Sequence, residues 1–192
     1  MGLTVLPGFL GLPSDFDFLP PVDADVVLGY SMGGRLALRQ LETRGAAAAS
    51  AAVIISTGLN APDEARRVRD EEWARRFESE EWSSLMRAWN VQEVFGGHVV
   101  DRREEDFDRA ELARQLREYS PAVLPPPRLE SIETPILWIA GERDSKYVDI
   151  AKTAVRRLPH AELWICPAAG HRVPWERPEL LVARLRTFLD LH

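Results

Sequence analysis

The chain carries a serine whose setting favours nucleophilic or base chemistry. Ser31 lies in the segment GYSMGG (residues 29–34), between an apolar run and a helix-like pattern. A G-x-S-x-G turn that joins a strand to a helix strains the serine backbone and aims its hydroxyl out of the strand's carboxyl end. A serine hydroxyl reacts weakly until a histidine takes its proton and a carboxylate orients that histidine. We therefore expect both partners later in the chain.

Asp144 and His171 are the predicted partners. Asp144 follows the apolar segment 135–140, and His171 follows the apolar segment 161–166. Taken alone, a loop aspartate is more often a turn or cap residue, and a loop histidine is usually solvated. Their placement after consecutive strands, in the order Ser, Asp, His, favours a catalytic triad instead. The remaining histidines lack such a setting and are predicted to be structural or exposed: His98, His160 and His192.

A sheet must position these residues, and the sequence predicts a parallel one. Short segments rich in Val, Ile and Leu are typical of buried parallel strands, and they occur at 3–6, 24–29, 51–56, 135–140 and 161–166. Helical patterns occur at 34–43, 148–158 and 178–191. This alternation indicates a sheet of five strands covered on both faces. Its predicted core residues are Val26, Val27, Leu28, Val53, Ile54, Ile55, Leu137 and Ile139.

Segment 61–120 interrupts the alternation with charged, helix-like sequence dotted with aromatic residues. We predict that it forms a helical cap inserted into a core made of residues 1–60 and 121–192. Only 19 residues separate Gly11 from Ser31, and a parallel crossover needs about a dozen, so we expect a short turn at 14–18 to return the chain. The first strand is then an exposed edge, where a second copy of the chain is a candidate partner.

Composition narrows the class of partner. The 192 residues carry a formal charge of −6 and no basic stripe interleaved with aromatic residues, which argues against nucleic acid. No apolar run reaches membrane-spanning length, and the start of the chain lacks the features of a signal peptide, so we predict a cytoplasmic protein. The single cysteine, Cys166, allows no internal disulfide and is predicted to be a buried apolar residue. No metal or cofactor is expected.

An oxyanion hole is predicted beside Ser31. The segment LPGFLG (6–11) after the first strand resembles the His-Gly loop that supplies one backbone donor at such sites, and the residue after the nucleophile supplies the other. The donors would be the amides of Phe9 and Met32. Pro7 stands where histidine is usual, which removes a side-chain hydrogen-bonding group. A plain strand-to-loop turn is the alternative.

With these residues in place, the chain resembles the 2-succinyl-6-hydroxy-2,4-cyclohexadiene-1-carboxylate synthases of menaquinone biosynthesis, in the α/β-hydrolase superfamily. The similar segments are 7–11, 29–38, 72–77, 141–147 and 169–171. The resemblance implies an α/β-hydrolase fold with a shortened, mostly parallel sheet. It also implies a carbon–oxygen lyase that eliminates pyruvate from a cyclohexene polycarboxylate, with Ser31 as a base and no acyl-enzyme.

The resemblance further implies four residues that bind the small-molecule carboxylate substrate: Arg35, Arg66, Trp89 and Asn60. A guanidinium pairs with a carboxylate in bidentate fashion. The chain holds 22 arginines and two lysines, so an arbitrary cap arginine is more often a solvated charge, whereas Arg35 has a fixed offset from the elbow. A further cap arginine of the family has no secure match among Arg102, Arg103 and Arg109.

Two other functions stay open. A carboxylic-ester hydrolase would use Ser31 as a true nucleophile. A degenerate, non-catalytic member would explain the shortened core and Pro7. The arginines discriminate between the two enzymes, because a hydrolase of neutral esters needs no carboxylate clamp such as Arg35 beside its serine.

Overall fold

The computed structural model describes residues 2–190, which divide into two compact units. The core unit is the chain up to Gly58 and from Pro127 onward, and the helical unit is Leu59–Pro126. The sequence predicts this insertion at 61–120. Leu191 and His192 lie outside the described residues. The predicted end of the last helix and the prediction for His192 fall on them.

The core unit is built on a five-stranded parallel sheet with the strand order β1-β2-β3-β4-β5. The strands are β1 Gly2–Leu6, β2 Asp25–Tyr30, β3 Ala51–Ile55, β4 Ile136–Gly141 and β5 Ala161–Cys166. The predicted five-stranded sheet is confirmed, and β1 is an edge strand as expected. Every predicted core residue on β2, β3 and β4 is buried, with at most 3 % of its surface exposed. Apolar residues fill both faces because helices cover both.

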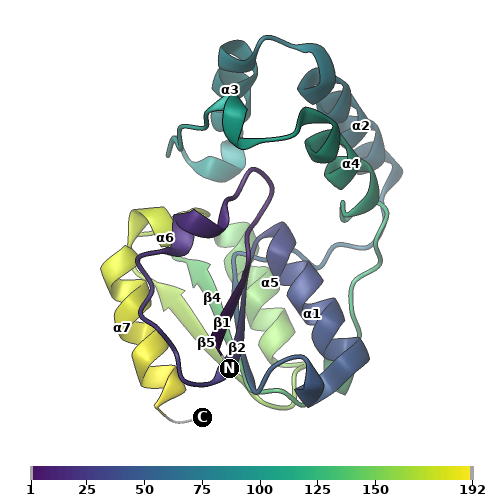
Figure 1. Ribbon diagram of the computed structural model, residues 1–192. Helices are drawn as coiled ribbons and strands as arrows, with labels where there is room; N and C mark the ends of the chain where they lie inside the picture. The colour runs from purple at the N-terminus through teal and green to yellow at the C-terminus, as the bar shows by residue number, and fades with distance from the viewer. Residues whose placement is uncertain (1, 191–192) are drawn as a thin grey trace. The chain divides into compact units, whose positions relative to one another are not determined.

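Helices α1 (Met32–Arg44) and α5 (Ser145–Val155) pack on one face of the sheet, and α7 (Pro178–Leu189) packs on the other (Figure 1). The short helix α6 (Val173–Glu176) precedes α7. Single 3₁₀ turns, η2 (Gly45–Ala47) and η5 (Leu129–Ser131), complete the connections. Helices α1 and α5 begin earlier than predicted, because Ser31 and Asp144 are themselves the residues that precede the first helical position.

The connection from β1 to β2 is a short turn, as predicted, formed by the 3₁₀ helix η1 (Pro13–Phe16). Phe16 is buried in the core on the α7 face, with its ring centroid 6.1 Å from that of Trp175. The connection from β2 to β3 through α1 runs over the opposite face. In a sheet whose parallel strands follow one another in order, connections on opposite faces have opposite hands. One of these two crossovers therefore departs from the right-handed rule.

The helical unit consists of α2 (Glu64–Ser79), α3 (Trp82–Asn90) and α4 (Arg109–Glu118), with 3₁₀ turns η3 (Glu93–Phe95) and η4 (Glu104–Asp106). Each α-helix begins at an acidic residue whose carboxylate accepts backbone N–H groups of the first turn: Asp63, Glu81 and Asp108. Ion pairs join α2 to α4. In the described part of the chain, no helix has the length and apolar character that a membrane crossing requires.

Candidate active site

Ser31 occupies a strained turn between β2 and α1. Its backbone angles are φ 53° and ψ −111°, a conformation that L-residues adopt only when the surroundings enforce it. Glycines make the turn possible, because a Cβ on Gly33 would lie 1.9 Å from the carbonyl oxygen of Leu6. A Cβ on Gly34 would likewise lie 1.9 Å from Oγ1 of Thr57. Helix α1 therefore approaches the sheet closely and holds the serine in place.

The structure brings the three predicted catalytic side chains together. Nε2 of His171 lies 3.3 Å from Oγ of Ser31, and Nδ1 of the same ring lies 2.8 Å from Oδ2 of Asp144. The side chains of His171 and Asp144 are only 3 % and 9 % exposed. With Nδ1–H donating to the carboxylate, Nε2 is the acceptor that faces the serine hydroxyl. This geometry matches a Ser-His-Asp arrangement.

The loop after β1 lies directly against the turn at Ser31. A Cβ on Gly8 would be 2.9 Å from the ring of Tyr30 and 3.2 Å from Cβ of Ser31. The amide of Phe9 follows this contact in the chain, and Met32 is the first residue of α1. Both predicted oxyanion donors thus belong to segments that meet at the serine, and their role stays a prediction.

Two aromatic rings lie beside the imidazole of His171. The ring centroids of Tyr147 and His171 are 4.4 Å apart in an edge-to-face arrangement, and that of Tyr30 is 5.7 Å away. Burial raises the pKa of Tyr30 above its ordinary value, so its hydroxyl stays protonated at neutral pH.

Burial also raises the pKa of the Cys166 thiol to about 11, so this cysteine is no thiolate nucleophile at neutral pH. The prediction that Cys166 is buried is confirmed.

Two further side chains lie beside the turn. Arg35, one helical turn after Ser31, is 2 % exposed, and its Nη1 donates to the carbonyl of Gly58 at 3.3 Å. Thr57 is fully buried, and its hydroxyl lies 3.2 Å from the carbonyl oxygen of Ser31 and 3.1 Å from that of Ile55. A buried hydroxyl so placed holds the strained serine backbone against the end of β3.

The other predicted substrate residues belong to the helical unit. Nε of Arg66 donates to both carboxylate oxygens of Asp70, at 2.7 and 2.9 Å, and the buried Asp70 also accepts from the hydroxyl of Ser120. Arg66 therefore has a structural partner inside its own unit. Asn60 is exposed near the start of this unit. Trp89 packs in a cluster of aromatic rings with Trp73, Phe77 and Phe95. Their role in substrate binding stays a prediction.

Two of the cap arginines that have no secure family match, Arg103 and Arg109, form ion pairs within the helical unit. Arg103 pairs with Asp106 and lies largely exposed. Arg109 pairs with Glu104 and donates through Nη1 to two backbone carbonyls at the end of α2. Both side chains thus stabilise the helical unit itself.

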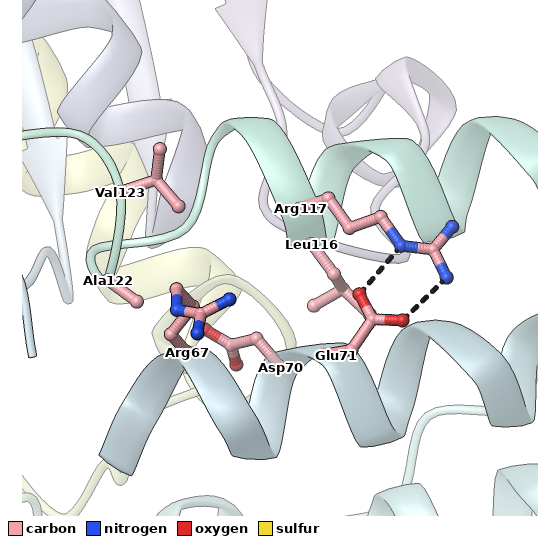
Figure 2. A pocket seen from close by; sticks show the side chains of 7 residues that line it. All are labelled: Arg67, Asp70, Glu71, Leu116, Arg117, Ala122 and Val123. Atoms are coloured by element: carbon pink, nitrogen blue, oxygen red, sulfur yellow. Dashed lines mark hydrogen bonds and ion pairs between the residues drawn. The ribbon is translucent and has the colours of Figure 1, made fainter. Parts of the chain in front are cut away.

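A pocket of about 230 Å³ lies between α2 and α4 (Figure 2). Its lining side chains are Arg67, Asp70, Glu71, Leu116, Arg117, Ala122 and Val123. The charges in it already have partners, because Arg117 bonds Glu71 at 2.8 and 3.0 Å and Arg67 bonds Glu64. A charged ligand would have to displace these pairs. We therefore place the candidate active site at the triad rather than in this pocket.

Some residues of the site were not predicted from the sequence. They are Thr57 at the end of β3, Tyr147 on α5, and Glu176, whose carboxylate bonds the loop that carries His171. The sequence signal for each was only its position shortly after a strand or a predicted site residue. Of the other histidines, His160 is exposed beside Glu133 and His98 is partly buried. Among residues 2–190, no group of His, Cys, Asp or Glu side chains is arranged to hold a metal ion.

The chain is similar in sequence and in fold to known proteins. The family described as "Alpha/beta hydrolase family" matches residues 6–184. The chain is 32 % identical to proteins named 2-succinyl-6-hydroxy-2,4-cyclohexadiene-1-carboxylate synthase from Escherichia coli and from Shigella flexneri serotype 5b. Each alignment covers 85 % of this chain and 67 % of the relative. Among solved structures, MenH from S. aureus is similar, with a TM-score of 0.81 and 22 % identity over 98 % of this chain and 92 % of that one. The carboxylesterase CesB from Bacillus subtilis has a TM-score of 0.65 and 17 % identity, over 97 % and 82 % of the two chains, and so shares the fold.

Proposed function

The chain belongs to the 2-succinyl-6-hydroxy-2,4-cyclohexadiene-1-carboxylate synthases within the α/β-hydrolase family, and we propose that it eliminates pyruvate from a cyclohexene polycarboxylate in menaquinone biosynthesis. The observation that carries the proposal is the hydrogen-bonded arrangement of Ser31, His171 and Asp144, with Ser31 in a strained turn. Identity to the synthases over most of the chain selects elimination from among the reactions that such a triad can perform. A cytoplasmic location stays a prediction.

The geometry supports serine as a base. Asp144 accepts the Nδ1–H of His171, which leaves Nε2 to take the hydroxyl proton of Ser31. The serine oxygen then removes a proton from a substrate carbon, and the electron pair left behind breaks the carbon–oxygen bond to the pyruvate group. The departing oxygen takes the proton from His171, which restores the starting state. No bond forms between substrate and enzyme.

Negative charge that develops on a substrate oxygen needs donors close by. The amides of Phe9 and Met32 are proposed for this role, since their two segments meet at Ser31. Substrate carboxylates need cations, and Arg35 is proposed as the first of them. It is fixed on the first turn of α1 by its burial and by its bond to Gly58. Arg66, Trp89 and Asn60 are proposed as further substrate-binding residues on the basis of the similarity to the synthases.

Replacement of Arg35 tests this function against the ester-hydrolase alternative. The variant Arg35→Met keeps most of the buried side-chain volume and removes the guanidinium. A charge-assisted contact is worth about 1.5–3 kcal/mol, so kcat/KM for the polycarboxylate should fall by ~10- to ~200-fold. A small neutral aryl ester cannot use the contact, and its turnover should change less than about twofold.

A matched control is Arg44→Met at the exposed end of the same helix, which should change neither activity. Equal loss of both activities in Arg35→Met would show that Arg35 supports the turn rather than the substrate. The ester-hydrolase interpretation would then be the better one.

A further inference from the structure

The loop that carries His171 is bonded on both sides of the histidine by one carboxylate. Oε2 of Glu176 accepts the backbone N–H of Gly170 at 2.8 Å, and Oε1 accepts the backbone N–H of Arg172 at 3.2 Å. Glu176 is the last residue of the one-turn helix α6, and its own N–H donates to the carbonyl of Arg172 at 2.9 Å. The carboxylate thus brackets His171 through its two neighbours.

The remainder of the loop is held to the segment that follows β4. The N–H of Ala168, whose φ is +53°, donates to Oε2 of Glu142 at 2.8 Å. The N–H of Arg143 donates to the carbonyl of Ala169 at 2.8 Å. These bonds fix the start of the loop relative to the segment that carries Asp144. The two bonds to Glu176 lie closer to the histidine, at the residues directly before and after it.

We propose that Glu176 is a positioning residue that keeps the His171 ring between Asp144 and Ser31. The contact from Nε2 to the serine is already 3.3 Å long, so a small shift of the loop breaks it. Hydrogen bonds to a carboxylate are stronger than bonds between neutral groups, and a pair of them restrains both translation and rotation of the loop. The effect of Glu176 on turnover rests on the proposed function, whereas its effect on the position of the ring does not.

Two substitutions remove one or both of the hydrogen bonds that the Glu176 carboxylate accepts. Glu176→Gln keeps the shape and one accepting oxygen, while its amide group would face a second donor, so one bond of the two survives. Glu176→Ala removes both. Misplacement of a catalytic group by about 1 Å costs on the order of 100-fold in rate. We therefore expect kcat to fall by about 10-fold in Glu176→Gln and about 100-fold in Glu176→Ala, with KM changed less than about twofold.

A spectroscopic readout distinguishes positioning from a general structural effect. The proton on Nδ1 of His171, bonded to Asp144, should give a far-downfield NMR signal in the unmodified protein, and Ser31→Ala should retain it. That signal should broaden in Glu176→Gln and disappear in Glu176→Ala, while the circular dichroism spectrum is unchanged. Glu179→Gln, an exposed glutamate at the start of α7, is the matched control and should alter neither rate nor signal.

Each outcome decides the proposal. Full kcat and an unchanged signal in Glu176→Ala would overturn it, and so would a loss of rate with the signal intact. If Glu176→Ala does not fold, Glu176→Gln carries the test alone. If the unmodified chain turns over no polycarboxylate but the signal is lost as expected, the proposed function fails and the positioning role stands.

Discussion

The close approach of α1 to the sheet predicts a severe effect of Gly33→Ala. The added Cβ would lie 1.9 Å from the carbonyl oxygen of Leu6 and 2.5 Å from that of Pro7. Both atoms belong to the backbone, so relief requires the start of α1 to move away from the end of β1 by an ångström or more. Overpacking of this kind costs about 1–3 kcal/mol, and a rigid backbone wall favours the upper end of that range.

The same movement separates Met32 from the loop that carries Phe9. We propose the amides of these two residues as the oxyanion donors, and misplacement of such a donor costs about 100- to 1,000-fold in kcat. The assays are urea unfolding and turnover of both the polycarboxylate and an aryl ester. Gly45→Ala at the other end of α1 is the control: its φ of +55° costs stability of about 1–3 kcal/mol, but nothing lies within 4 Å of the added Cβ, so kcat should be unchanged. Gly33→Ala with kcat within about twofold of the original would refute the predicted contact.

Two further predictions concern stability and assembly. Hydrogen bonds from the backbone N–H groups of Ser83 and Ser84 lower the pKa of Glu81 to about 2. The contribution of this carboxylate to stability is therefore complete above about pH 4.5, and it is lost as the pH falls toward 2. The difference in unfolding free energy between the unmodified protein and Glu81→Ala should therefore shrink across that range, and a constant difference would contradict the assignment. The edge strand β1 has an exposed Thr4 and no charged residue, so we expect a second copy of the chain to pair with it. Thr4→Lys should then dissociate this dimer, as measured by sedimentation. A monomeric unmodified protein would exclude this pairing.

The strands and the triad could be predicted because their signals are local. An apolar run such as 51–56 specifies a buried strand by itself, and parallel strands place their carboxyl ends, and hence Asp144 and His171, at one edge. The role of Glu176 could not be predicted, because it depends on which backbone N–H groups of a folded loop need an acceptor. The face taken by Phe16 was equally hidden, since an apolar side chain satisfies either face of a sheet.

The direct test of the central claim is to supply the purified chain with the polycarboxylate and measure pyruvate release together with formation of the conjugated diene. We predict that the two products appear in equal amounts and that Ser31→Ala abolishes both. We also predict that no acyl-enzyme accumulates on Ser31 during the reaction. Hydrolysis of the aryl ester through an acyl-enzyme on Ser31, with no pyruvate released from the polycarboxylate, would contradict the account.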